Sequence, residues 1–306
     1  MREALNKCRI EGILSECNLE YGSYTNASGQ NVDTVRGNIK VLVRQTINGR
    51  PIDNEIQVEM FSPKYTKNGS SNPAYESISK IKNEFTSIAA AGGEDGADGI
   101  RITGARLQMN EYWDANMRLV SYPRISASFA QKVRKDELRP EATFTVEMVV
   151  GSQGYMENAE GAPIVDEDGN QKYELVGLIP MYGDRIDKVK FVCANENVIN
   201  AVQTNWQNGD TVKASGRLNF TSTYEKVIDE QGFGESIERS RTITVRDIVI
   251  TGGLPTPLEG EFAYTPDEIN KALADRQARL EKDKANAGSK TKAHQAPQRS
   301  SFNLGF

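Results

Sequence analysis

Histidine is almost absent from this sequence. The 306-residue chain contains one, His294, in a polar segment close to the C-terminus. A Ser-His-Asp triad, a Cys-His nucleophile pair and a multi-histidine zinc site each need an ordered imidazole in a cleft. We therefore expect no catalytic residues, no metal site and no cofactor, and we predict that the protein is not an enzyme.

Cysteine is also scarce, with three residues at positions 8, 17 and 193 and no Cys-x-x-Cys spacing. So few thiols exclude a disulfide framework and indicate a reducing compartment. Cys8 alternates with Ile10 and Leu14, so we predict that it is a small core residue. No apolar run approaches the roughly 18 residues of a membrane span, and residues 1–14 contain no apolar signal segment. These absences predict a soluble, cytoplasmic protein without a membrane partner.

An excess of positive charge, the usual mark of a nucleic-acid-binding domain, is missing too. The chain holds 42 acidic and 37 basic side chains, which gives a net charge of −5. Residues 141–260 carry 19 acidic and 10 basic groups, whereas residues 1–140 carry 17 and 19. Charge therefore argues against nucleic-acid binding mainly for the middle of the chain.

What the sequence does contain is a repeated order of strands and helices. Period-two alternation and β-branched enrichment predict five strands before residue 139 and five after it. The first five are Lys7–Tyr21, Val35–Arg44, Glu55–Phe61, Ile102–Trp113 and Arg118–Phe129, and the second five are Ala142–Tyr155, Tyr173–Tyr182, Lys188–Ala194, Thr211–Tyr224 and Ser240–Thr251. Helical spacing predicts a helix after the third strand of each block, over Pro73–Phe85 and Asn195–Gln207.

The two blocks also share a short stretch of sequence. Residues 104–113, GARLQMNEYW, align with residues 215–224, SGRLNFTSTY, at a constant offset of 111. A match this short can arise by chance, but the shared element order supports a tandem duplication. Five strands with a helix between the third and the fourth form the OB-fold. We therefore predict a mainly β protein with two tandem OB-fold barrels, each a five-stranded Greek-key barrel.

One stretch carries a more specific resemblance. Residues 196–220, ENVINAVQTNWQNGDTVKASGRLNF, resemble the helix, Gly-Asp turn and fourth strand of OB-fold single-stranded DNA-binding proteins, including those of bacteriophages and mobile elements. The resemblance implies sequence-tolerant binding of single-stranded DNA in phage or mobile-element DNA replication or recombination, in the cytoplasm of a bacterial host. OB barrels also serve as structural modules. The alternative is therefore a structural or interaction protein whose barrels assemble into an oligomer or a virion component.

The predicted organisation has four segments. They are a first OB-fold domain at 1–140, a second at 141–258, a C-terminal helix at 259–288 and a disordered tail at 289–306. Thr265, Pro266 and Glu268 supply a helix cap, and the tail lacks the apolar content needed to fold. The last residue of the tail is Phe306. In this one feature the tail resembles the acidic tails of many bacterial single-stranded DNA-binding proteins, which also end in phenylalanine. The acidic run is missing here, so docking of replication or recombination proteins on the tail stays open, as does homo-oligomer formation.

Candidate DNA-binding residues in the first barrel fall into two groups. Arg36, Lys40 and Arg44 share one face of the second strand, where an OB-fold binds nucleic acid, and could contact phosphates. The third strand places Glu55, Gln57 and Glu59 nearby, so a solvated salt-bridge ladder is the alternative. The second group interleaves rings and cations, as a single-strand groove requires. Its members are Tyr112, Trp113, Arg118, Tyr122 and Arg124. The alternative is that Trp113 and Tyr122 cover the barrel end as core.

The second barrel offers weaker candidates, because it is acidic overall. They are Tyr182, Arg185, Lys188, Lys190, Arg217 and Tyr224. Lys188 and Lys190 alternate with Val189 and Phe191, so both lysines are expected to face outward. Trp206, at the end of the predicted helix, is interpreted as a core residue. Whether this barrel binds DNA or protein is left open.

Overall fold

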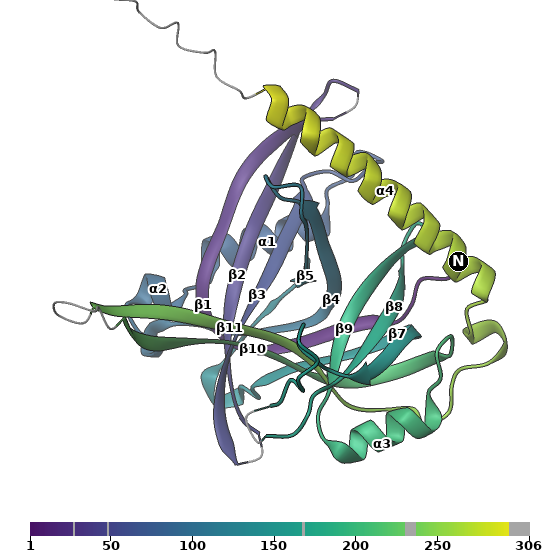
Figure 1. Cartoon of the computed structure of the whole chain (residues 1–306). Coiled ribbons are helices and arrows are strands. Elements are labelled where there is room, and N and C mark those ends of the chain that lie inside the picture. Colours follow the sequence, from purple (N-terminus) through teal and green to yellow (C-terminus); the bar gives the residue numbers. More distant parts are fainter. Residues whose placement is uncertain (27, 48, 167–168, 230–236, 294–306) are drawn as a thin grey trace, which may run out of the picture.

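The computed structural model describes residues 1–293 except 27, 48, 167–168 and 230–236 (Figure 1). Its strands are β1 (Asn6–Thr25), β2 (Asn31–Ile47), β3 (Arg50–Pro63), β4 (Gly99–Trp113), β5 (Leu119–Ser126), β6 (Gln131–Val133), β7 (Glu141–Tyr155), β8 (Tyr173–Met181), β9 (Arg185–Cys193), β10 (Thr211–Asp229) and β11 (Ile237–Gly253). The helices are α1 (Pro73–Glu84), α2 (Ile88–Ala91), α3 (Glu196–Asn205) and α4 (Pro266–Ala293). The protein is mainly β, as predicted.

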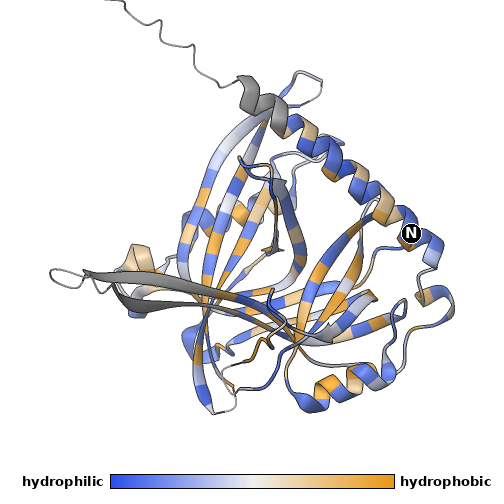
Figure 2. Cartoon of the chain, in the orientation of Figure 1, coloured by the Kyte–Doolittle hydropathy of each residue, from blue (hydrophilic) through white to orange (hydrophobic). Residues whose placement is uncertain are grey.

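The first barrel is closed in the order β1-β2-β3-β5-β4, with β4 returning to β1. The alternation of the sequence explains its core. Val35, Ile39 and Val41 of β2 are fully buried, whereas Arg36 between them is exposed. Figure 2 shows the same alternation of hydrophobic and hydrophilic residues along most strands. Helix α1 begins after Asn72, whose side chain accepts a hydrogen bond from the amide of Ala74. The first OB-fold is therefore as predicted, with strands longer than the sequence pattern indicated.

The second barrel repeats this arrangement. Its strands pair in the order β7-β8-β9-β11-β10, and β10 returns to β7. Helix α3 again follows the third strand, beginning after Asn195. Trp206 is 4% exposed and donates from Nε1 to the carbonyl oxygen of Leu254 at 2.9 Å, so its predicted core position is confirmed. The offset of 111 residues relates topologically equivalent strands, because Arg106 lies in β4 and Arg217 in β10.

The two barrels share one sheet. Strand β1 pairs antiparallel with β7 over Asn6 to Glu11, so all eleven strands form a continuous hydrogen-bonded order. Cys8 lies opposite Phe144 in this pairing and is fully buried, which confirms its predicted core role. Phe144 in turn contacts Phe191, with ring centroids 5.6 Å apart. The junction is therefore part of the hydrophobic core.

Helix α4 lies across both barrels (Figure 1). It begins with the predicted cap, in which the amide of Thr265 donates to the Glu268 carboxylate at 3.0 Å. Ile269, Ala272 and Leu280 are buried, so the thin apolar stripe packs against the barrels. The helix continues to Ala293, past the predicted end near residue 288. Residues 294–306 of the predicted disordered tail, with His294 and Phe306, lie outside the described residues.

Candidate nucleic-acid interface

A groove with a volume of about 760 Å³ crosses the outer face of the first barrel. Strands β2, β3, β4 and β5 and the residues that follow β5 contribute to its walls. Its lining side chains include Asn38, Phe61, Arg106, Gln108, Arg124 and Phe129, and we call this surface the aromatic groove. Strand pairing brings these residues together, since Asn38 lies opposite Glu59, Arg106 opposite Ser126 and Gln108 opposite Arg124.

Two phenylalanines in the aromatic groove were missed by the sequence reasoning. Phe61 and Phe129 are 55% and 56% exposed. Phe61 lies on the same face of β3 as the polar residues Gln57 and Glu59. An aromatic ring on a polar face is a signal that could have identified Phe61 from the sequence. Phe129 lies within the predicted fifth strand, Arg118–Phe129, but β5 ends at Ser126, so strand alternation does not place its side chain.

A pair of tyrosines extends the surface along β4 and β5. Tyr112 and Tyr122 contact each other edge to face, with ring centroids 6.4 Å apart. The side-chain amide of Asn110 donates to the Tyr122 hydroxyl at 2.6 Å and holds that ring in place. Tyr122 lies two residues from Arg124 on the same strand face, about 7 Å along the strand. This tyrosine pair therefore continues the row of rings and arginines that begins in the aromatic groove.

The cations of the β2 face lie on the outside of the barrel as expected, but each has a carboxylate partner. The pairs are Arg36 with Glu20 at 3.1 Å, Lys40 with Glu16 at 2.9 Å, and Arg44 with Glu94 at 2.7 Å. Lys40 and Arg44 also pair with Glu55 and Asp53 of β3 at 3.8 and 3.4 Å. The alternative salt-bridge ladder thus forms, mostly with acids from β1 and from the segment before β4. The pairs of Arg36 and Arg44 are exposed, and exposed pairs contribute only about 0.2–1 kcal/mol each, so a phosphate can displace their carboxylates.

The arginines of the aromatic groove also have carboxylate partners. Arg124 contacts Glu59 at 2.9 Å, and Arg106 forms an ion pair with Glu3. The buried Nε of Arg124 has no hydrogen-bond partner, so one of its donors is unused. Arg118 lies in the turn before β5, 3.6 Å from Asp114, with 75% of its side chain exposed. Arg118 is therefore the most accessible of the predicted cations of this hairpin.

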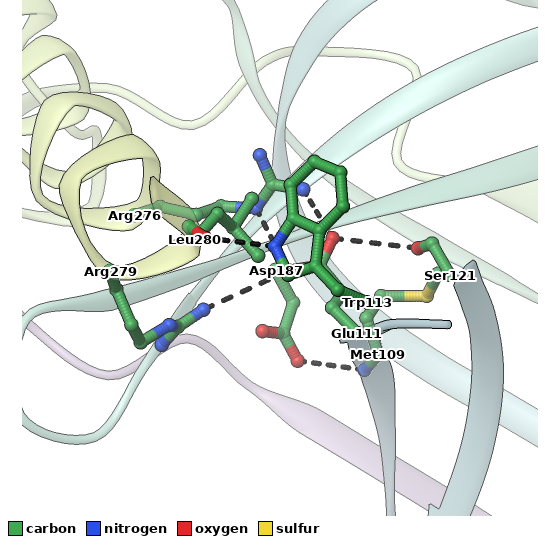
Figure 3. Close-up of polar contacts among 8 residues, drawn as sticks. All are labelled: Met109, Glu111, Trp113, Ser121, Asp187, Arg276, Arg279 and Leu280. Carbon is green, nitrogen blue, oxygen red and sulfur yellow. Dashed lines mark hydrogen bonds and ion pairs between the residues drawn. The ribbon is translucent and has the colours of Figure 1, made fainter. Parts of the chain in front are cut away.

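Trp113 lies on the opposite face of β4 from Tyr112. Figure 3 shows its indole against α4, with Nε1 donating to the carbonyl oxygen of Leu280 at 2.8 Å. The ammonium of Lys284 lies 4.6 Å from the ring centroid. Glu111, also on this face, pairs with Arg276 and Arg279 of α4, and its side chain is 5% exposed. The structure therefore does not bring Trp113 together with Tyr112 and Tyr122.

The candidate residues of the second barrel come from β9, β10 and the turn before β9. Tyr182 is 81% exposed in the turn between β8 and β9, and Arg185 begins β9. The remaining four are Lys188, Lys190, Arg217 and Tyr224, on β9 and β10. Lys188 and Lys190 face outward as predicted, and Lys190 pairs with Glu174 at 3.0 Å. Burial lowers the pKa of Arg217, whose Nε has no hydrogen-bond partner. The side chain of Tyr224 lies outside the described part of the molecule.

A second groove, of about 920 Å³, lies where β1 meets β4, β6 and β7. Its charges are compensated, since Arg101 donates to Glu11 at 2.6 Å and this contact lowers the pKa of Glu11. No aromatic residue is among its lining residues in the described structure. The aromatic groove is therefore the stronger candidate for bases.

Among the described residues, no three His, Cys, Asp or Glu side chains are grouped so as to hold a metal ion. None of the helices in the described part of the chain is both long and apolar enough to cross a membrane.

Comparison with known proteins identifies a family and a fold. The profile of the YorF family matches residues 4–286. No curated protein has a significantly similar sequence. The wild-type single-stranded DNA binding protein from Thermus aquaticus is similar in structure, with a TM-score of 0.51 and 10% identity over 87% of this chain and 99% of that chain. The structure of a deletion mutant of that protein has a TM-score of 0.47 and 12% identity, over 87% of this chain and 100% of that chain. At these identities the similarity concerns the OB-fold architecture.

Proposed function

This chain belongs to the YorF family, and we propose that it binds single-stranded DNA with little sequence preference on the outer face of its first barrel. The observation that carries the proposal is a continuous row of accessible rings and arginines. Phe61 and Phe129 lie in the aromatic groove with Arg124, and Tyr122 and Tyr112 follow it. Bases stack on such rings at about 1–3 kcal/mol each, whatever their identity.

The mechanism that we propose is an exchange of partners. In the free protein Arg124 and Arg36 are paired with Glu59 and Glu20. A bound strand places bases on the rings and phosphates on the arginines, and the carboxylates return to water. The exchange costs little because the Arg36–Glu20 pair is exposed and the Arg124–Glu59 pair is only partly buried. It also predicts an affinity that falls with salt, with a slope of about −0.7 per neutralised phosphate.

The biological setting and the domain limits belong to the same proposal. The resemblance of residues 196–220 to phage and mobile-element proteins supports a role in DNA replication or recombination of such elements. We place this role in a non-enzymatic protein of the bacterial host cytoplasm, with domains at 1–140 and 141–258. The C-terminal tail is proposed to dock replication or recombination proteins.

A fluorescence anisotropy titration of the full chain with labelled dT30 tests the proposal. We expect saturable binding at low salt that is at least tenfold tighter than binding to a 30-base-pair duplex. A parallel titration with rU30 measures the preference for DNA over RNA. Equal affinity for duplex, or no binding to dT30, would contradict the proposal. A large, salt-resistant assembly in light scattering that ignores DNA would instead support the structural alternative.

A matched pair of variants locates the site. Phe61→Ala removes a ring from the aromatic groove, and Phe262→Ala removes a ring of nearly equal exposure, 55% against 54%, near the start of α4. We expect Phe61→Ala to weaken dT30 binding by roughly fivefold or more and Phe262→Ala to have no effect. An equal effect of both variants would place the site elsewhere.

A further inference from the structure

The hairpin formed by β10 and β11 of the second barrel extends across the first barrel (Figure 1). Its attachment is specific. The amide of Phe220 on β10 donates to the side-chain oxygen of Asn54 on β3 at 3.0 Å. Asn54 is fully buried and Phe220 is 7% exposed. This contact fixes the hairpin next to the outer surface of the first barrel.

The attachment of the hairpin brings Arg246 of β11 close to the tyrosine pair, Tyr112 and Tyr122. It lies directly opposite Phe220 in the hairpin, so the two side chains point to the same face. The guanidinium carbon of Arg246 is 5.8 Å from the ring centroid of Tyr122. A residue of the second barrel thus lies beside the row of rings that belongs to the first.

Arg246 differs from the other cations of this surface in its lack of a carboxylate. Arg36, Arg106 and Arg124 each form an ion pair, whereas Arg246 is exposed and has no acidic partner among the described residues. Its neighbour Asp247 points to the other face of β11 and is paired with Lys172 at 3.0 Å. A phosphate at Arg246 would therefore displace no carboxylate of the described residues.

We propose that Arg246 binds a phosphate of the same single strand that stacks on Tyr122, so that one DNA strand contacts both barrels. The inference rests on the proposed function and adds a residue of the second barrel to it. A base on the Tyr122 ring places its flanking phosphates within reach of the nearby guanidinium, which is free to turn toward them. Arginine suits this position because it both stacks on rings and donates two hydrogen bonds to a phosphate.

The test compares Arg246→Gln with Lys271→Gln, which removes one positive charge from an exposed position on α4. Both full-length variants are titrated with labelled dT30 at several salt concentrations. We expect Arg246→Gln to weaken binding by roughly tenfold at low salt and to make the salt slope shallower by about 0.7. Lys271→Gln should bind like the wild type. Arg246→Lys should retain most of the slope, because it retains the charge.

The outcomes separate the inference from the proposed function. Wild-type affinity and slope in Arg246→Gln would overturn the inference while the binding function stands. Absence of dT30 binding by the wild-type chain would overturn both. A reduced affinity with an unchanged slope in Arg246→Gln would also contradict phosphate contact. Thermal unfolding of both variants checks the fold, and Arg246→Lys keeps the test valid if Arg246→Gln does not fold.

Discussion

Trp113 and Leu280 are joined by a hydrogen bond from the indole Nε1 to the main-chain carbonyl oxygen, 2.8 Å long, between residues 167 positions apart in the chain. This bond attaches α4 to the first barrel. The ammonium of Lys284 lies over the same ring. Glu111, two residues before Trp113 on the same face of β4, forms an ion pair with Arg276 (Figure 3). The tryptophan that the sequence offered for base stacking therefore has a set of protein contacts of its own.

The first prediction concerns Trp113→Ala. We expect this change to lower the free energy of unfolding by about 2 kcal/mol, less than the loss for a fully buried ring, because the indole packs against α4. The affinity for dT30 should stay within twofold of the wild type. Urea denaturation and anisotropy titration measure the two quantities. Tyr112→Ala, which removes a ring that is 47% exposed, is the control and should show the opposite pattern. If Trp113→Ala instead lost affinity for dT30 and kept its stability, Trp113 would belong to the DNA-binding surface.

A second prediction uses the competition between carboxylates and phosphates. Glu59→Gln removes the acid that pairs with Arg124 at 2.9 Å, so a phosphate no longer has to displace it. We expect dT30 to bind roughly threefold or more tightly at low salt, with the gain lost as salt screens the charges. Glu84→Gln, which disrupts an exposed pair with Lys80 on α1, is the control. Unchanged or weaker binding by Glu59→Gln would argue against phosphate contact at Arg124.

The third prediction concerns pH and Asp187, which is 2% exposed on β9 and accepts a hydrogen bond from the amide of Met109 at 2.9 Å. Burial raises the pKa of this carboxyl, and the hydrogen bond from Met109 opposes the effect together with the nearby charges of Arg185 and Arg279. The folded protein therefore binds this proton more tightly than the unfolded chain, and stability falls as pH rises above the usual value of about 3.9. Asp187→Asn should be more stable than the wild type at pH 7, and the difference should shrink below about pH 4.

Urea unfolding at several pH values measures this difference. The asparagine side chain keeps an oxygen that can accept from Met109, so the hydrogen bond is retained. A variant that is less stable than the wild type at pH 7 would show that the charged carboxylate is favoured by its arginine neighbours.

The fourth prediction concerns the three thiols. Burial raises the pKa of Cys8 and of Cys193 to about 12, and both are shielded from solvent. Cys17 is only half-buried, although burial raises its pKa as well. A thiol reagent such as DTNB at pH 8 should therefore modify only Cys17, slowly, in the folded protein. All three should react after unfolding in guanidinium chloride. Rapid reaction of two or more thiols in the folded chain would contradict this burial.

The sequence alone was sufficient for the architecture. Alternation along β2 placed Arg36, Lys40 and Arg44 on one face, and the structure buries Val35, Ile39 and Val41 of the other face. The place of each helix after the third strand of its block then indicated two OB-folds. These properties are local, because the two-residue period of a strand sets which side chains share a face.

The tertiary structure decided what meets each face. The sequence pattern grouped Trp113 with Tyr112 and Tyr122, whereas Trp113 lies on the opposite face of β4, which the packing of α4 covers. The same limit applies to Arg36, whose partner Glu20 comes from β1. Arg246 carried no signal at all, because its contact with Tyr122 depends on how the second barrel's hairpin crosses the first barrel. A strand pattern reports the direction of a side chain, whereas its partners depend on segments that lie far away in the sequence.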